Sequence, residues 1–193
     1  MTCAGVTIAI DASGAGGLDT GSVAANTWYH IWQISNGTAV TGMFSTSATS
    51  PTMPSGYTLK CRLGAVLTDG SANIIPVVQH GKTFYWEDPP LDYDDTSSTS
   101  AESLTLSVPT GVSVEAIFNV FIGGTIYTRF SSLDVDDEAP TQTAAPLADL
   151  SYYERGSRIR EFTNTSGQLR VRSSGAQSRR VSTLGWTDHE LQF

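Results

Sequence analysis

The chain has 193 residues, of which 39% are hydrophobic and 16% charged, with a formal net charge of −8 and a pI near 4.7. This length is enough to bury the core of one large all-β domain. The acidic balance excludes general nucleic-acid binding, because phosphate contacts require a basic surface. No stretch approaches the roughly 18 apolar residues of a transmembrane helix, so no membrane insertion is predicted.

Short β-type segments, each closed by turn residues, recur along the first part of the chain. The earliest is Val6–Ile10, which a glycine-rich stretch follows. Thr27–Ile34 and Val40–Phe44 flank Asn36 and Gly37, a dipeptide typical of a tight hairpin turn. These two segments are therefore predicted to be paired strands.

The segment Tyr57–Thr68 shows the alternation of a strand that buries one face. Lys60 and Arg62 fall on one side, and the other side carries Leu59, Cys61 and Leu63. We expect the apolar side to face the core.

The second part of the chain continues the strand pattern. Gly123 and Gly124 form the predicted hairpin turn between Val112–Ile122 and Thr125–Phe130. The remaining predicted strands are Ile74–Gln79, Lys82–Trp86, Leu104–Val108, Arg158–Thr163, Gln168–Arg172 and Val181–Trp186. With about eleven strands and no helical periodicity, the predicted fold is all-β, an antiparallel β-sandwich of jelly-roll type with essentially no helix.

Two acidic segments interrupt this pattern. Glu87–Ser103 contains a Pro-Pro pair, several acidic residues and a Ser/Thr tract, and Asp134–Leu150 is similar. If these segments were domain linkers, the chain on each side of them would be too short to form a well-packed sandwich. We therefore predict a single domain over residues 1–193, with long exposed loops at about 87–103 and 134–150.

Charge is unevenly distributed, since residues 1–150 carry 15 acidic and 4 basic residues, whereas residues 151–193 carry 4 and 7. Four arginines have i, i+2 spacing on two successive predicted strands: Arg158, Arg160, Arg170 and Arg172. On neighbouring strands they would form a basic ladder on one sheet face. Three interpretations stay open: a solvated face, a contact with an acidic neighbour such as another copy's Asp-rich loop, or an acidic-glycan surface.

The string Asp19-Thr20-Gly21-Ser22 matches the catalytic loop of aspartic proteases. That chemistry needs two carboxylates that share a proton, and a single such string would require a dimer. A glycine-rich stretch precedes it instead of an apolar strand. The sequence therefore does not favour a protease.

The carboxylates of the two acidic segments are hard oxygen ligands of the kind that calcium takes. The candidate ligands are Asp92, Asp94, Asp95, Asp134, Asp136 and Asp137. Neither group matches an EF-hand, so a solvated acidic loop is the alternative. His30, His80 and His189 share no ligand or triad spacing, and no other cofactor is predicted.

Aromatic residues form the remaining pattern. Trp28, His30 and Trp32 lie on one face of their predicted strand, either in the core or, if exposed, as a stacking platform for a sugar or a partner. Aromatic residues beside the acidic segments suit a recognition surface. The candidate binding residues are Trp86, Tyr93, Tyr152 and Tyr153, with Arg158, Arg160, Arg170 and Arg172.

The two cysteines, Cys3 and Cys61, have no CxxC spacing, so a disulfide and two thiols are both open. Residues 1–10 lack the basic segment and apolar core of a secretory signal. Folding in a reducing cytoplasm is therefore expected.

Several longer strings resemble one family. They are LDTGSVAANTWYHIW (Leu18–Trp32), FSTSATSPTMPSGYTLK (Phe44–Lys60), RLGAVLTDGSANI (Arg62–Ile74), and TNTSGQLRVRSS with TLGWTDHE (Thr163–Ser174, Thr183–Glu190). Together they resemble a domain of virion proteins from phages and prophages of proteobacteria, usually described as tail-fibre proteins. The string LDTGS belongs to that family's own pattern, and the family has no established catalytic residues to carry over.

The resemblance implies a non-enzymatic virion component, a tail- or head-fibre or spike module that attaches to the particle and contacts a host surface glycan. It also implies a homo-oligomer, expected to be a trimer, with other virion proteins as partners. The localisation that it implies is the virion, after synthesis in the cytoplasm of the host bacterium. One alternative is a structural capsid or tail decoration protein with no host ligand. Another is an enzyme that degrades surface polysaccharide, against which stands the lack of a convergent acid pair in the sequence.

Overall fold

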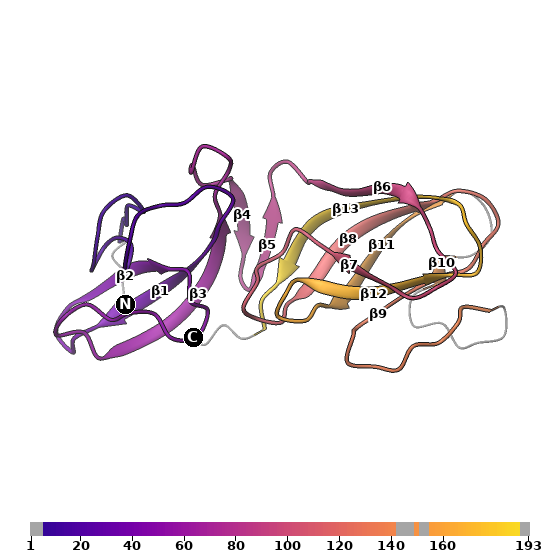
Figure 1. Cartoon of the computed structure of the whole chain (residues 1–193). Coiled ribbons are helices and arrows are strands. Elements are labelled where there is room, and N and C mark those ends of the chain that lie inside the picture. Colours follow the sequence, from indigo (N-terminus) through magenta and orange to yellow (C-terminus); the bar gives the residue numbers. More distant parts are fainter. Residues whose placement is uncertain (1–5, 142–148, 151–154, 190–193) are drawn as a thin grey trace. The chain divides into compact units, whose positions relative to one another are not determined.

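The structure is a computed structural model that describes residues 6–141, 149–150 and 155–189 (Figure 1). These residues form thirteen strands and no helix, and all pairings between the strands are antiparallel. The predicted all-β antiparallel fold is therefore confirmed, whereas its jelly-roll connectivity stays a prediction. Within the same residues, no helix has the length and apolar character needed to cross a membrane.

The chain divides into two compact units, one that includes the described residues 6–75 and one that spans Pro76–His189. The division falls between Ile75 and Pro76, at neither of the acidic segments that the sequence marks as possible linkers. The organisation as a single domain stays a prediction.

The first unit is built on a three-stranded sheet in the order β2-β1-β3. Its strands are β1 (Trp28–Ser35), β2 (Val40–Ser45) and β3 (Leu59–Leu67). The predicted β1–β2 hairpin is present, but its turn is longer than the tight Asn36-Gly37 turn that the sequence predicts. Within this turn, the Asn36 side chain accepts hydrogen bonds from the backbone N–H groups of Thr38 and Ala39. Val6–Ile10 is not a strand, since Ala9 instead donates its N–H to Gly16 within the glycine-rich stretch.

The β1 face that carries Trp32 is a buried face of this sheet and not an exposed stacking platform. Trp32, Ile34 and Met43 form a buried cluster, against which Met53 and Tyr57 pack from the segment that precedes β3. The Trp32 indole N–H donates to a backbone carbonyl, so its polar group is satisfied inside the unit.

The buried side of β3 is the opposite of the predicted one. Arg62 is only 6% exposed, whereas Leu59 is 61% exposed. The Arg62 guanidinium donates through Nε to Nδ1 of the buried His30 at 3.0 Å, and the Lys60 ammonium lies 5.4 Å from the centre of the Trp32 ring. The basic side of β3 therefore shares the face of the β1 aromatic residues, where side-chain partners offset the cost of burying charge.

The second unit contains two sheets, one in the order β10-β9-β12-β7 and the other in the order β11-β8-β13-β5-β4, with β6 also paired to β13. Their bounds are β4 (Val77–His80), β5 (Thr83–Trp86), β6 (Leu91–Thr96), β7 (Glu102–Thr105), β8 (Glu115–Ile122), β9 (Thr128–Ser131), β10 (Asp149–Leu150), β11 (Arg155–Phe162), β12 (Gln168–Ser173) and β13 (Ser178–Thr187). The rings of Phe118 on β8 and Phe130 on β9 meet edge to face at 5.4 Å. This contact joins the inner faces of the two sheets, as in a β-sandwich.

Two predictions for this unit are wrong. Gly123 and Gly124 do not close a hairpin, because β8 pairs with β11 and β13 in one sheet while β9 pairs with β10 and β12 in the other. The segment Glu87–Ser103 is not a long loop, because it contains β6, whose acidic residues lie opposite arginines of β13, and the start of β7. Short strands with charged side chains lack the apolar alternation by which strands are recognised in a sequence.

Strand β13 contains a bulge between Thr183 and Gly185, where it turns from β6 to β5 as its neighbour. A Cβ atom at Gly185 would lie 1.9 Å from the carbonyl oxygen of Phe84, a backbone atom of β5. The close approach of these two backbones therefore requires glycine at this position.

We expect Gly185→Ala to destabilise the second unit by about 3 kcal/mol or more, because the β5 backbone would have to move. Calorimetry would show this as a lower Tm. Gly123→Ala is the matched control, since its nearest atom would be at an ordinary 3.5 Å. Equal Tm values for the two variants would contradict the prediction.

Candidate functional site

The four predicted arginines do not form one ladder. Arg158 and Arg160 lie on β11 and Arg170 and Arg172 lie on β12, and these strands belong to different sheets. The two strands follow one another in the chain without pairing, because β11 pairs with β8 while β12 inserts between β9 and β7. The basic ladder is therefore a wrong prediction.

The β12 arginines contact the chain's own acidic segment. The Arg172 guanidinium lies 2.6 Å from the carboxylate of Asp137, and Arg170 donates to the backbone carbonyl of Val135 at 2.5 Å. The contact with an acidic neighbour is thus found within one chain, and these arginines hold residues 135–137 against the sheet.

The candidate calcium ligands also have partners in the chain. Asp92 bonds with Ser107 and Thr183, Asp94 pairs with Arg180, Asp95 with Arg179, Asp134 with Ser132, and Asp137 with Arg172, while Asp136 is exposed. Across residues 6–141, 149–150 and 155–189, no three acidic, histidine or cysteine side chains gather as a metal site. Most of these carboxylates are thus engaged by the fold.

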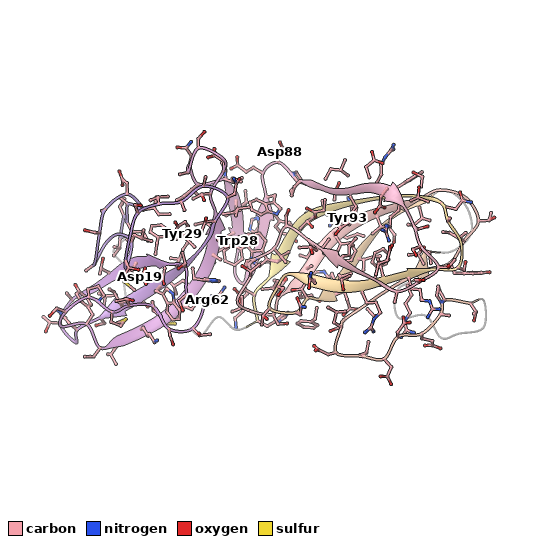
Figure 2. All side chains as sticks on the ribbon, in the orientation of Figure 1. Asp19, Trp28, Tyr29, Arg62, Asp88 and Tyr93 are labelled. Carbon is pink, nitrogen blue, oxygen red and sulfur yellow. The ribbon has the colours of Figure 1, made fainter. Side chains whose placement is uncertain are left out.

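The predicted aromatic candidates are structural where they are described. Trp86 is 5% exposed, packs edge to face with Trp186, and donates its indole N–H to the carbonyl of Ser107 at 3.0 Å. Tyr93, labelled in Figure 2, accepts a hydrogen bond from the Thr105 N–H at 3.0 Å. Tyr152 and Tyr153 lie outside the described residues, as does Cys3, whereas Cys61 is half-buried on β3.

Arg179, which the sequence analysis did not identify, forms the most extensive ion-pair cluster among the described residues of the second unit. It is 2% exposed, and its Nε and Nη2 donate to Asp95 at 2.9 and 2.8 Å, with a further bond to Glu102 at 3.1 Å. Its guanidinium lies 5.8 Å from the centre of the Tyr93 ring. The cluster connects β13 to β6 in its own sheet and to β7 in the other sheet.

Burial alone would lower the pKa of Arg179, but the hydrogen bonds and charges of Asp95 and Glu102 outweigh it and raise that pKa above its ordinary value. The guanidinium therefore stays charged. A pattern in the sequence could have indicated the pairing. Two adjacent acids, Asp94 and Asp95, lie antiparallel to two adjacent bases, Arg179 and Arg180, which places each acid opposite a base.

Asp19 has a structural role in the first unit (Figure 2). Its carboxylate accepts hydrogen bonds from the Ser45 hydroxyl at 2.6 Å, the Thr20 N–H at 2.8 Å and the Thr52 N–H at 2.9 Å. It thereby connects the glycine-rich stretch to the end of β2 and to the segment beyond. The protease-like string is thus a loop that the hydrogen bonds of Asp19 hold in place.

The outer face of the larger sheet carries the site with the most ligand-like chemistry. On this face β11, β8 and β13 lie side by side (Figure 1). Register places Arg158, Asn119 and Ser182 in one row across the three strands, and places Phe121 next to Arg180 in the adjacent row. These five side chains line an open groove of about 380 Å³, called here the β8 groove.

The alternation of β8 and β13 explains why the β8 groove is polar. On β8, Phe118 and Val120 are buried in the sandwich, so Asn119 and Phe121 project from the opposite face. On β13, Val181 is buried between the sheets, so Arg180 projects outward. The groove volume falls within the usual range for small-ligand sites, roughly 300–1,000 Å³.

The β8 groove offers hydrogen-bond donors and acceptors, two cations and one aromatic ring. Asn119 and Ser182 can bond hydroxyl groups, the two guanidinium groups can bond an anion, and the half-buried Phe121 ring can stack. Its described lining contains no carboxylate and no histidine. The groove is therefore equipped to bind a ligand, and its lining does not supply the acid pair of a glycosidase.

No family model, no curated protein and no solved structure matches the chain.

We expect Asp95→Asn to destabilise the second unit by about 2–3 kcal/mol, because Arg179 would keep its buried charge with only Glu102 beside it. The Nη1 of Arg179 already has no hydrogen-bond acceptor among the described residues. Asp94→Asn is the control on the same strand, since its partner Arg180 is exposed and that pair is worth at most about 1 kcal/mol. Calorimetric Tm values that rank Asp94→Asn below Asp95→Asn would contradict this assignment.

Proposed function

We propose that the chain is a non-enzymatic module of a bacteriophage virion, of the fibre or spike type, that contacts a host surface glycan through the β8 groove. The observation that carries the proposal is the grouping of Asn119, Phe121, Arg158, Arg180 and Ser182 on one exposed sheet face. The virion assignment rests on the sequence strings that resemble phage tail-fibre proteins.

The chemistry of the groove supports a sugar ligand. A pyranose ring has apolar C–H faces that pack on an aromatic ring and hydroxyl groups that need hydrogen-bond partners around them. Phe121 offers the ring, and Asn119 and Ser182 lie opposite each other in the adjacent row of side chains. Their positions on paired strands fix their geometry before a ligand arrives, which lowers the entropic cost of binding.

An open groove of this kind binds a single glycan weakly, because it removes only part of the ligand surface from water. We therefore propose that the module works as a homotrimer attached to other virion proteins. Repeated copies raise the effective concentration of the glycan at each groove, and avidity can exceed the single-site affinity by about 10²–10⁴-fold.

The direct test is saturable binding of the purified, labelled chain to host cells, together with its mass by light scattering. A saturable signal from an oligomer supports the proposal. A folded protein that binds capsids or tails lacking it, and does not bind cells, would overturn the proposal in favour of a decoration protein. Reducing ends or unsaturated uronates released from host capsule would instead identify an enzyme.

We expect Phe121→Ala to weaken cell binding about tenfold, because the stacking ring of the groove is lost. The control is Phe162→Ala, a 43% exposed ring on β11 that does not line the groove. It should bind like the unsubstituted chain. If both variants bind normally, the β8 groove is not the contact surface.

A further inference from the structure

We infer that the ligand of the β8 groove is an acidic sugar whose carboxylate is bound by Arg158 and Arg180. This inference rests on the proposed function and specifies its ligand class. It depends on which arginines of the unit already have acidic partners and which do not.

The described arginines of this unit are mostly satisfied within the chain. Arg179 has two carboxylates, and Arg160 on β11 lies 3.2 Å from Glu115. Among the described residues, no carboxylate pairs with Arg158, although this side chain is exposed at the edge of the groove. In a chain of net charge −8, an unpaired arginine in a groove is a specific place for an anion.

Arg180 is only partly engaged. It bonds Asp94 through Nε at 3.0 Å, and the two side chains are 57% and 53% exposed. Its terminal nitrogens have no acceptor among the described residues. An exposed pair of this kind adds little to stability, so a ligand carboxylate can bond the terminal nitrogens or take the place of Asp94.

The spacing of the two arginines matches a sugar. Arg158 lies opposite Asn119 and Arg180 opposite Phe121, on the two sides of β8. Two strand spacings across the sheet and two residues along it place their backbones about 12 Å apart. One or two sugar rings cover this distance, with Phe121 beneath them and the carboxylate within reach of the long arginine side chains. A guanidinium binds a planar carboxylate through two parallel hydrogen bonds.

The surrounding charge favours one carboxylate on a sugar over a polyanion. Asp94 lies beside Arg180, and the net charge of the chain is negative. A nucleic acid or a densely sulfated chain would be repelled by this field, whereas a single uronic or sialic acid places its one charge at the arginines.

The test compares sialyllactose and a disaccharide with a single uronic acid with their carboxyl-reduced counterparts by isothermal titration calorimetry. We expect the acidic forms to bind the unsubstituted chain about tenfold more tightly at low salt, with the difference shrinking as salt rises. Arg158→Gln should abolish the difference in affinity between the acidic and the reduced sugars. Asp94→Asn should tighten the binding of the acidic sugars, because it removes the carboxylate that competes for Arg180.

Arg160→Gln is the matched control, because it removes the same charge from the same face of β11 outside the groove. It should keep the preference for the acidic forms. Equal binding of acidic and reduced sugars, or a preference that Arg158→Gln leaves unchanged, would overturn the inference. The proposed function would still stand in that case if Phe121→Ala weakened binding, and both would fall if the chain bound neither sugars nor cells.

Discussion

The ion-pair cluster of Arg179 is the interaction on which the second unit depends. Strand β13 pairs with β8 along one edge and with β6 and β5 along the other, and Arg179 points from it into the space between the two sheets. A buried guanidinium is tolerated only with strong partners, and Asp95 and Glu102 come from both sheets. The requirement that this charge be paired therefore fixes β6 and β7 in place.

The same alternation decides what faces the solvent. Because Arg179 points inward, its neighbour Arg180 must point outward, where it joins Asn119 and Phe121 of β8 in the groove. A register shift of one residue would exchange the two arginines and remove both the buried cluster and the candidate site. Stability and the proposed binding chemistry thus depend on one strand register.

Most of the described carboxylates of the two acidic segments stabilise the fold. Asp92, Asp95 and Asp137 each bond a residue that lies far away in the sequence, so they fasten strands and loops to one another. A surface whose charges are mostly paired internally offers few sites for an anionic ligand. Among the described residues no carboxylate pairs with the exposed Arg158, so its charge is available for a ligand.

The sequence by itself determined the all-β class and most strand positions, because alternation and turn residues are local properties. It did not determine which strands pair, since pairing depends on contacts between distant residues. For this reason β11 and β12 were expected to be neighbours, and the Gly123–Gly124 turn was expected to close a hairpin.

Only the tertiary structure decided the role of each charge. The sequence places Arg62 on the polar side of its strand and does not single out Arg179, yet both are buried beside partners that only the fold brings close. The sequence predicted the binding site beside the acidic segments, whereas the candidate site lies on the face of a sheet. Its five side chains come from three strands, and only the register of those strands places them together.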